Sequence, residues 1–323
     1  MTVIDRTHWE QSSPWIDDCT AGIDEYLARV GKTCSFDLHQ KLHEWRELGI
    51  VIFENAIDPE LIDSYLADLE HLESHHTKYD LPVEHAGKLK PINQYTRAEL
   101  SLGQIKFNSV HMISEAACRL SLTREICEFL SHIFGGSACV LQSLTFIKGS
   151  QQPIHIDYPY VRTQTKLAHL AASWIPLEEV DPRSGPLAYY PGSHKLEASG
   201  FFDWGNGSVL SEPDSVHTSM EFAHHLWARM KQLGIDPVIY CPKKGDLLIW
   251  HGNLAHEGAA IQESGLTRRS YVTHYTSLEA YPPAFKTKDA FERGAYFTQH
   301  GGYVFDFPWA LNGPKLPSWS RDV

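Results

Sequence analysis

The feature that most constrains the fold is a series of short β-rich segments that begins near residue 138. The segments are CVLQSLTFIKG, PIHIDYPY, LAHLAASWIPLE, PLAYYPGSH, VIYCPKKGDLLIWHG and RRSYVTHYTS. Each is rich in β-branched or aromatic residues and is bounded by turn-forming Gly, Pro, Asp or Ser, as in DPRSG and KKGD. Many short strands at this spacing predict a sandwich or barrel and disfavour an alternating α/β sheet.

Helical patterns precede this region. Apolar residues recur at helical spacing in FDLHQKLHEWRELG and DPELIDSYLADLEHLESHH, and Asp58 and Pro59 are suited to the N-cap and first turn of the second helix. Between the two helices, IVIFENA is a short β-rich run. A further helix is expected in SEAACRLSLTREICEFLSHIFGG, and residues 214–234 predict a helical insertion between strands.

We therefore expect a single domain over residues 1–323, mainly β with flanking helices, because the chain has no repeat, low-complexity tract or linker. Residues 1–137 are expected to be a mostly helical amino-terminal support. Residues 138–280 are expected to form the β core, and residues 281–323 a carboxy-terminal extension near the pocket.

Composition narrows the possible partners. The formal net charge of −12 disfavours binding to nucleic acid or to an anionic membrane, since both need clustered Lys and Arg. No run approaches the ~18 apolar residues of a membrane helix, and the amino-terminal residues do not resemble a secretory signal. The six cysteines are dispersed, without a C-x-x-C pair. A cytoplasmic protein is expected, and its oligomeric state is not predicted.

One short stretch, QQPIHIDYPY, contains a histidine and a carboxylate two residues apart, His155 and Asp157. The same spacing occurs at His8/Glu10 and His71/Glu73, in segments that indicate helix or loop. On a strand, side chains at i and i+2 point to the same face, so His155 and Asp157 can bind one metal together. Two histidines and one carboxylate on one face are the ligands of mononuclear iron(II) oxygenases, and they leave three positions open.

The remaining groups of such a site are present in one later segment, GDLLIWHGNLAHEGAAIQESGLTRRSYVTHY. His251 and His256 are candidates for the third ligand, and Arg268 and Arg269 are candidates for a carboxylate clamp. The planar guanidinium fork pairs bidentately with a carboxylate. Because side chains alternate along a strand, only one of the two arginines can face the pocket.

Taken together, these motifs resemble the phytanoyl-CoA dioxygenase (PhyH) family of iron(II)- and 2-oxoglutarate-dependent oxygenases. GPLAYYPGSHKLE, GDLLIWHGNLAHEG and RRSYVTHY follow the H-x-D pair, and LHEWRELGIVIFENAIDPELIDSYLADLEHL precedes it. The resemblance covers residues 38–280. It implies a double-stranded β-helix (a jelly-roll, cupin-like core), with Fe(II) as metal and 2-oxoglutarate and O2 as cosubstrates. The implied reaction is hydroxylation of an unactivated C–H bond of a small organic molecule, with release of succinate and CO2.

The same resemblance assigns the site residues. It implies that His155, Asp157 and His256 are the metal ligands and the catalytic centre, that Arg268 binds 2-oxoglutarate, and that Gln142 contacts this cosubstrate from a neighbouring strand. A departure from the family pattern is Ala259, which follows the glycine of HEG where a serine is usual.

Four further residues are candidates for contacts to the substrate. They are Tyr158, Tyr160, Arg162 and Trp174. Trp174 could instead fill the hydrophobic core, which is the usual position of an indole side chain. The other three residues could instead lie in a solvated loop. Arg97 and Lys106 could meet an anionic group or lie in solvent.

Other readings stay open at this stage. Asp157 favours hydroxylation over halogenation, because related halogenases lack this carboxylate, while desaturation, cyclisation and epimerisation remain compatible. A cupin-type metal enzyme that does not use 2-oxoglutarate and a non-catalytic binding protein on the same barrel are the alternatives. The sequence does not specify the substrate.

Overall fold

A computed structural model describes most of the chain. The described residues are 6–31, 34–85, 87–101, 103–161, 163, 165–195, 218–281, 296–305 and 313–319.

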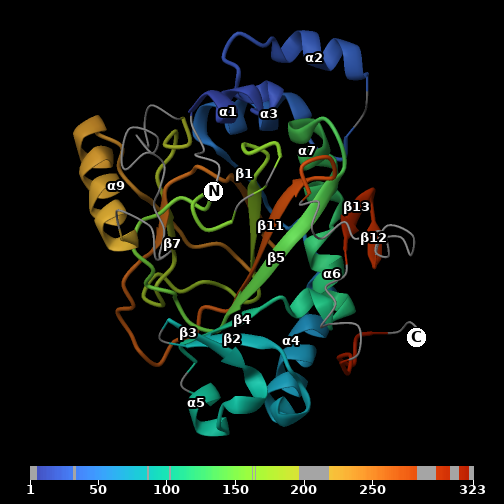
Figure 1. The fold of residues 1–323 in the computed structure, drawn as a ribbon, viewed down its shortest axis with the longest axis vertical. Helices are drawn as coiled ribbons and strands as arrows, with labels where there is room; N and C mark the ends of the chain where they lie inside the picture. Colours follow the sequence, from blue (N-terminus) through green and yellow to red (C-terminus); the bar gives the residue numbers. More distant parts are fainter. Residues whose placement is uncertain are drawn as a thin grey trace.

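Two antiparallel sheets form the centre of the molecule (Figure 1). The larger has ten strands among the described residues, in the order β1-β9-β6-β11-β5-β4-β2-β3, with β12 and β13 beside this path. Its strands are β1 (Ile50–Phe53), β2 (Pro82–His85), β3 (Lys88–Pro91), β4 (Ile105–Asn108), β5 (Ala138–Phe146), β6 (Ala171–Pro176), β9 (Leu247–His251), β11 (Ser270–Ser277), β12 (Phe297–Gln299) and β13 (Gly302–Val304). The pairing of β13 with β5 is parallel, and the other pairings are antiparallel.

The smaller sheet has three strands in the order β10-β7-β8. They are β10 (His256–Gly258), β7 (Leu187–Tyr189) and β8 (Val238–Tyr240). Trp174, Trp250 and Val272 of the large sheet pack with Leu187 and Tyr189 of the small sheet in one buried cluster. The two sheets therefore enclose a shared interior, which is where the candidate site lies.

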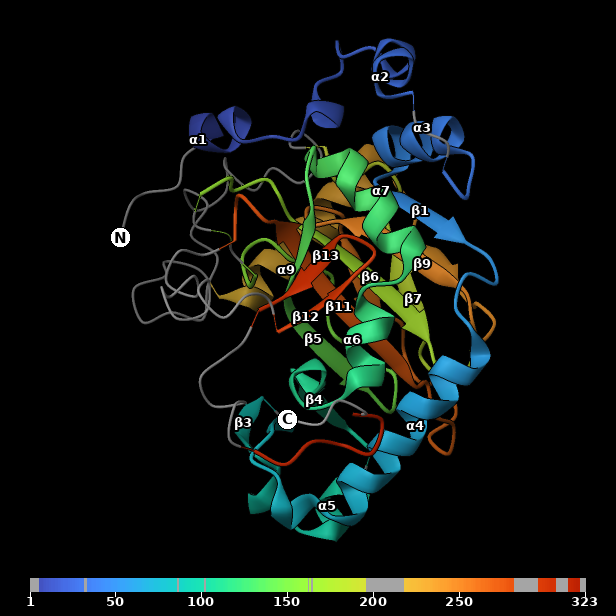
Figure 2. The ribbon, with the colours of Figure 1, turned by 90° about the vertical axis from the view of Figure 1, so that its right-hand side faces the viewer.

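The described helices are α1 (Arg6–Gln11), α2 (Ile23–Val30), α3 (Leu38–Leu48), α4 (Pro59–Ser74), α5 (Arg97–Ser101), α6 (Glu115–Ser121), α7 (Arg124–Phe134) and α9 (Ser219–Leu233). Several of them cover the face of the large sheet that points away from the small sheet. In Figure 2, α4, α6 and α7 lie across this face, and their apolar residues form the main core with Ile175, Ile249 and Tyr271 of the sheet. Helix α9 lies apart from them, at the side of β7 (Figure 1).

Local sequence features explain where several helices begin. The Asp58 carboxylate accepts a hydrogen bond from the Glu60 amide at 2.9 Å, and Pro59 is the first residue of α4, as predicted. A capping box of Thr218 and Glu221 begins α9. The insertion predicted over residues 214–234 is thus a helix, and its first four residues lie outside the described ranges.

One expectation about the amino-terminal region was wrong. The segment expected to form one helix forms two, α6 and α7, because Thr123 adopts an extended conformation (ψ 161°) at the N-cap position of α7. Gly135 ends α7 in the left-handed conformation. Strands β1 to β4 of this region join the large sheet, and β1 lies in the β-rich run IVIFENA that was expected between the two helices.

The expectation of a regular strand at PIHIDYPY was also wrong. His155 makes a single antiparallel bridge with His256, and the chain then turns away. The Gly252 carbonyl accepts hydrogen bonds from the amides of both Asp157 (2.9 Å) and Tyr158 (3.2 Å), which bends the backbone. Of the described helices, none is long and apolar enough to cross a membrane.

Candidate metal and cosubstrate site

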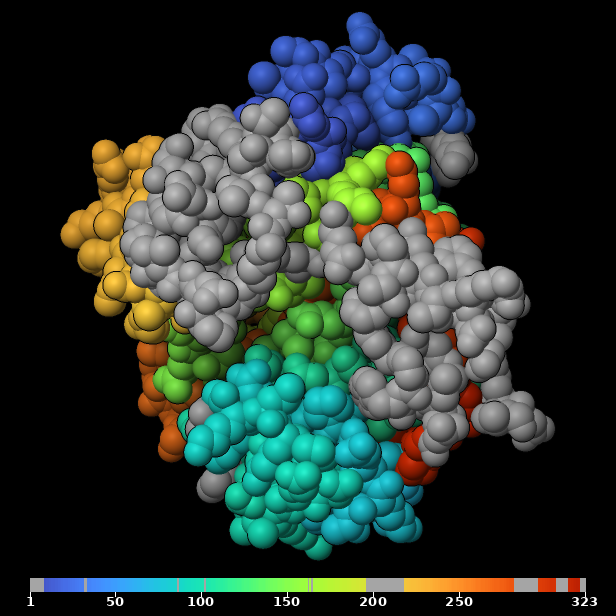
Figure 3. All heavy atoms as spheres, in the orientation of Figure 1, coloured from blue at the N-terminus to red at the C-terminus, as the bar shows by residue number. Residues whose placement is uncertain are grey.

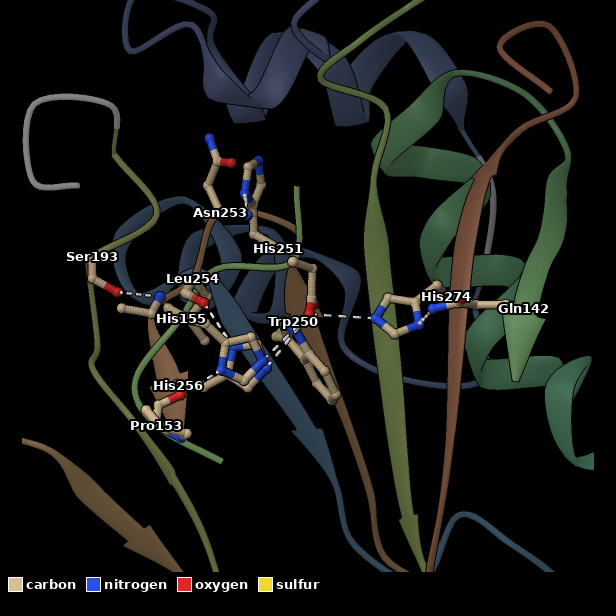
Figure 4. A network of polar contacts seen from close by, with 12 residues as sticks. Gln142, Pro153, His155, Ser193, Trp250, His251, Asn253, Leu254, His256 and His274 are labelled. Atoms are coloured by element: carbon tan, nitrogen blue, oxygen red, sulfur yellow. Dashed lines mark hydrogen bonds and ion pairs between the residues drawn. The ribbon is translucent and has the colours of Figure 1, made fainter. Parts of the chain in front are cut away.

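Three side chains converge between the sheets. His155, Asp157 and His256 each offer a ligand atom, and these atoms lie within 4.8 Å of one another. The Asp157 Oδ1 atom is 3.9 Å from His155 Nε2 and 3.6 Å from His256 Nε2. All three residues are buried. Figure 4 shows the two imidazoles side by side, with their Nε2 edges toward the same point.

The backbone brings the two histidines together. The His155 amide donates to the His256 carbonyl and the His256 amide to the His155 carbonyl, both at 2.9 Å. Beyond this bridge, a Cβ at Gly258 would lie 2.4 Å from Ser150 Oγ and 2.7 Å from the Gln151 nitrogen. The glycine of HEG is therefore required so that β10 can approach the segment that leads to His155.

Hydrogen bonds fix the tautomer of both histidines. His155 Nδ1 lies 2.9 Å from the Pro153 carbonyl oxygen, and His256 Nδ1 lies 2.9 Å from the Leu254 carbonyl oxygen. A carbonyl oxygen only accepts, so both Nδ1 atoms carry the proton and both Nε2 lone pairs face the centre of the site. Burial, reinforced by the neighbouring His256, lowers the pKa of His155 to about 3, which keeps this imidazole neutral. Neutral Nε2 atoms with inward lone pairs fit a divalent metal.

The carboxylate is oriented by a residue that the sequence did not reveal. Trp250 Nε1 donates to Asp157 Oδ2 at 2.7 Å, which leaves Oδ1 facing the histidines. Burial alone would raise the pKa of Asp157, but the nearby His256 and His274 outweigh burial and lower it below its usual value. The carboxylate is therefore ionised and fits the third position of a metal site.

Arg268 is a buried cation without an acidic partner in the described part of the chain. Its side chain is 3% exposed, its Nη1 donates to Ser270 Oγ at 2.9 Å, and its Nε makes no hydrogen bond. Its guanidinium lies 5.6 Å from the ring centres of both Phe146 and Trp174. Burial lowers the pKa of Arg268 to about 10, so the group is still charged at neutral pH. A buried guanidinium with free donors fits a carboxylate ligand.

A cavity of about 60 Å³ connects the arginine to the three ligand residues. It is lined by residues of both sheets, among them Phe146, Trp174, Leu187, Val272 and His274. Arg269, the alternative clamp, points away from this cavity, and its Nε lies 4.0 Å from Glu178. His251, the alternative ligand, lies on the other side of β9 near Asp17, at 3.3 Å (Figure 4).

The predicted substrate contacts are dispersed. Tyr158 is buried and packs edge-on against Trp9, with ring centres 4.2 Å apart. Tyr160 is 42% exposed, and its ring centre lies 6.0 Å from that of His155. Trp174 lines the cavity at its arginine end. Arg162 lies outside the described residues.

Gln142 is next to a second residue that the sequence did not single out. Its Nε2 lies 3.3 Å from Nδ1 of His274, whose own Nε2 lies 3.4 Å from Asp157 Oδ1. The signal for His274 was available, because Arg268, Val272 and His274 are separated by even numbers of residues and line the same cavity. The same alternation directs Trp250 inward and His251 outward on β9.

A family model describes residues 45–270 of the chain, and that family is phytanoyl-CoA dioxygenase (PhyH). The chain belongs to this family. The match covers well over half of the chain and contains every predicted metal ligand together with Arg268. The prediction of an iron- and 2-oxoglutarate-dependent oxygenase of this family is confirmed. No curated protein sequence is significantly similar to the chain.

Solved structures of this oxygenase class share the fold. The α-ketoglutarate-dependent epimerase SnoN of nogalamycin biosynthesis is 16% identical, with a TM-score of 0.55 over 83% of this chain and 97% of SnoN. The carbocyclase SnoK of the same biosynthesis is 17% identical, with a TM-score of 0.53 over 76% of this chain and 86% of SnoK. EctD from S. alaskensis with bound Fe is 14% identical, with a TM-score of 0.56 over 78% of this chain and 81% of EctD. At these identities the likeness concerns the fold.

Proposed function

We propose that this PhyH-family protein binds Fe(II) through His155, Asp157 and His256 and hydroxylates a C–H bond of a small organic molecule. The observation that carries the proposal is the inward convergence of two Nε2 lone pairs and one ionised carboxylate oxygen. Three protein ligands on one face leave room for a cosubstrate and O2. The bound iron supplies the activation of O2 that oxidation of a C–H bond needs.

We propose that Arg268 binds the distal carboxylate of 2-oxoglutarate, with Trp174 and Phe146 enclosing it. The support is a charged guanidinium that has free donors, no carboxylate partner among the described residues and an open path to the metal ligands. The apolar walls exclude water from this path and strengthen the ion pair. Gln142 has its amide beside His274, so a direct contact to the cosubstrate stays a prediction.

The reaction within the class is also part of this proposal. The structural relatives named above include an epimerase and a carbocyclase, so the fold is compatible with several outcomes. Asp157 occupies the carboxylate position of the site, which favours hydroxylation over halogenation. Succinate and CO2 would be the products of the cosubstrate.

A second groove is our candidate for the substrate site. It has a volume of about 760 Å³ and shares Phe146, Ser150 and Gln152 with the metal cavity. Tyr160 and Lys106 also line it, and Lys106 pairs with Glu84 at 2.7 Å. Figure 3 shows the surface hollowed between the cyan lobe, which contains β2, β3 and α5, and the green strands. A small organic molecule in this groove would lie beside His155.

The finer architecture is proposed on the same grounds. The two antiparallel sheets would form the jelly-roll of a single domain over residues 1–323, with residues 1–137 as support, 138–280 as the core and 281–323 as an extension near the pocket. A cytoplasmic location stays a prediction.

The decisive experiment measures succinate formation by the Fe(II)-loaded protein with 2-oxoglutarate and O2 while fractions of a metabolite extract are added. The proposal expects a low basal rate and a fraction that stimulates it, with a product 16 mass units heavier than the substrate. Arg268→Met should lose both rates, whereas Arg269→Met should keep them. Turnover of a substrate without 2-oxoglutarate would support a cupin-type enzyme instead. Absence of succinate under all conditions would support a binding protein.

A further inference from the structure

His274 is a buried histidine of the cavity for which the metal ligands and the arginine clamp leave no role. It is 3% exposed, and its Nε2 makes only a long contact to a described residue, 3.4 Å to Asp157 Oδ1, without the geometry of a hydrogen bond. Buried polar atoms are satisfied in the large majority of cases, so an unsatisfied one at a site needs a partner that the protein itself does not provide. Figure 4 shows the ring directed toward the metal ligands, with Gln142 next to it.

The neighbours of His274 determine which nitrogen carries the proton. Its Nε2 lies 3.4 Å from Asp157 Oδ1, an atom of an ionised carboxylate that can only accept. A lone pair on Nε2 would repel this oxygen, so Nε2 bears hydrogen. Nδ1 then accepts from the amide group of Gln142, 3.3 Å away. The tautomer is the opposite of that in His155 and His256, whose Nδ1 atoms donate to carbonyls.

The three histidines around the Asp157 carboxylate, His155, His256 and His274, therefore differ in what their Nε2 atoms offer to a ligand. Two of them present lone pairs and suit a metal, whereas His274 presents an N–H donor and does not. This donor lines the same cavity as Val272 of β11 and as Arg268, which precedes β11 by two residues and His274 by six. A linear dicarboxylate that extends from Arg268 to the metal would lie along this cavity and bring its metal-binding end to His274.

We propose that His274 Nε2 donates a hydrogen bond to the 1-carboxylate of 2-oxoglutarate, and that Gln142 holds His274 in the required tautomer. The inference rests on the proposed function, since it presupposes the metal site and the Arg268 clamp. It makes Gln142 a positioning residue that acts through His274. A hydrogen bond to a charged group would also compensate the burial of the imidazole N–H.

The test uses two probes that differ at one end only. 2-Oxoglutarate and 4-oxopentanoate share the carboxylate for Arg268 and the ketone, but 4-oxopentanoate has a methyl group in place of the 1-carboxylate. Binding of each is measured by calorimetry or ligand-observed NMR on protein loaded with Ni(II), which avoids turnover. The variants are His274→Phe, which removes the donor and keeps a ring, and Gln142→Leu. His169→Phe is the matched control, because His169 is equally buried and stacks on Phe134, outside the site.

For His274→Phe we expect Ni(II) binding within about threefold of the parent protein and 2-oxoglutarate binding weaker by about 10- to 100-fold, the range for a hydrogen bond to a charged group. The affinity for 4-oxopentanoate should change by less than about threefold, since this probe lacks the accepting group. Gln142→Leu should also weaken binding of 2-oxoglutarate and not of 4-oxopentanoate, by a smaller factor than His274→Phe. His274→Gln, which keeps an N–H donor, should recover part of the lost affinity. His169→Phe should match the parent protein for both probes.

Three results would overturn the proposal: unchanged 2-oxoglutarate affinity in His274→Phe, an equal loss for both probes, or loss of Ni(II) binding in both His274→Phe and His274→Gln. The last would mean that His274 supports Asp157 and not the cosubstrate. Failure of the proposed function is distinct, because then the parent protein loaded with Ni(II) would itself fail to bind 2-oxoglutarate.

Discussion

The buried guanidinium of Arg268 should lower the free energy of unfolding and increase the affinity for 2-oxoglutarate. The substitution Arg268→Met should therefore raise the stability of the fold and lower that affinity. Burial lowers the pKa of Arg268 from 12.5 to about 10, which corresponds to a cost of about 3 kcal/mol for the charged form. A cation whose pKa is lower in the folded state destabilises that state by this full amount at every pH below about 10. The destabilisation disappears only as the pH rises from about 10 to the pKa of the unfolded state. The cost is therefore fully present at neutral pH.

Methionine removes this charge and fills a similar volume. It also removes the hydrogen bond from Nη1 to Ser270 Oγ, worth about 1 kcal/mol, so the variant should gain about 2 kcal/mol in free energy of unfolding. In a chain of this length the gain corresponds to a rise in Tm of a few degrees. Affinity for 2-oxoglutarate should fall by about 2–5 kcal/mol, because one partner of a buried ion pair is lost.

Thermal unfolding of the metal-free protein and calorimetric titration of 2-oxoglutarate into the Ni(II)-loaded protein measure the two effects separately. Arg269→Met is the control: its guanidinium is half-exposed beside Glu178, so neither Tm nor affinity should change appreciably. Arg268→Met with a lowered Tm and unchanged 2-oxoglutarate affinity would refute the reasoning, because the arginine would then be a structural residue.

Three further outcomes are expected. Asp157→Ala should abolish binding of Co(II), followed by its visible absorption, whereas His251→Ala, on the other side of β9, should retain it; equal loss in both would contradict the ligand assignment. Trp250→Phe should weaken Co(II) binding by about 10- to 100-fold with the fold intact, because Asp157 Oδ2 loses its donor; parent-like affinity would show that this hydrogen bond does not orient the ligand. Burial lowers the pKa of His111 to about 3, so the unfolded state takes up its proton first as the pH falls below 6.5. In urea unfolding, this residue should therefore lower the free energy of unfolding by up to about 1.4 kcal/mol per pH unit as the pH falls from 6.5 to about 3. The variant His111→Gln should lack this contribution. The same acid dependence in both proteins would show that His111 does not cause it.

Much of the fold was predictable because its signals are local. The helix that begins at Asp58 and Pro59 depends on capping and apolar spacing within a few residues, and the structure contains it as predicted. Most β-rich segments are strands, since alternation and turn residues are also local properties. The break at Thr123 was missed because the apolar pattern of α6 and α7 is nearly continuous, and only packing distinguishes one helix from two.

For the site, the sequence by itself determined the chemistry: which histidines, carboxylate and arginine are present, and which family pattern they follow. The tertiary structure decided which of them meet. His155 and His256 come together through one backbone bridge between segments a hundred residues apart, and pleat alternation turns Arg268 and Trp250 inward while Arg269 and His251 face outward. The place of His274 beside Asp157 follows from the register of β11 against β5 and β6, which no local pattern specifies. Alternation from Arg268 could have placed His274 on the cavity side, but long-range pairing fixes the register, so its position next to Asp157 emerged only with the fold.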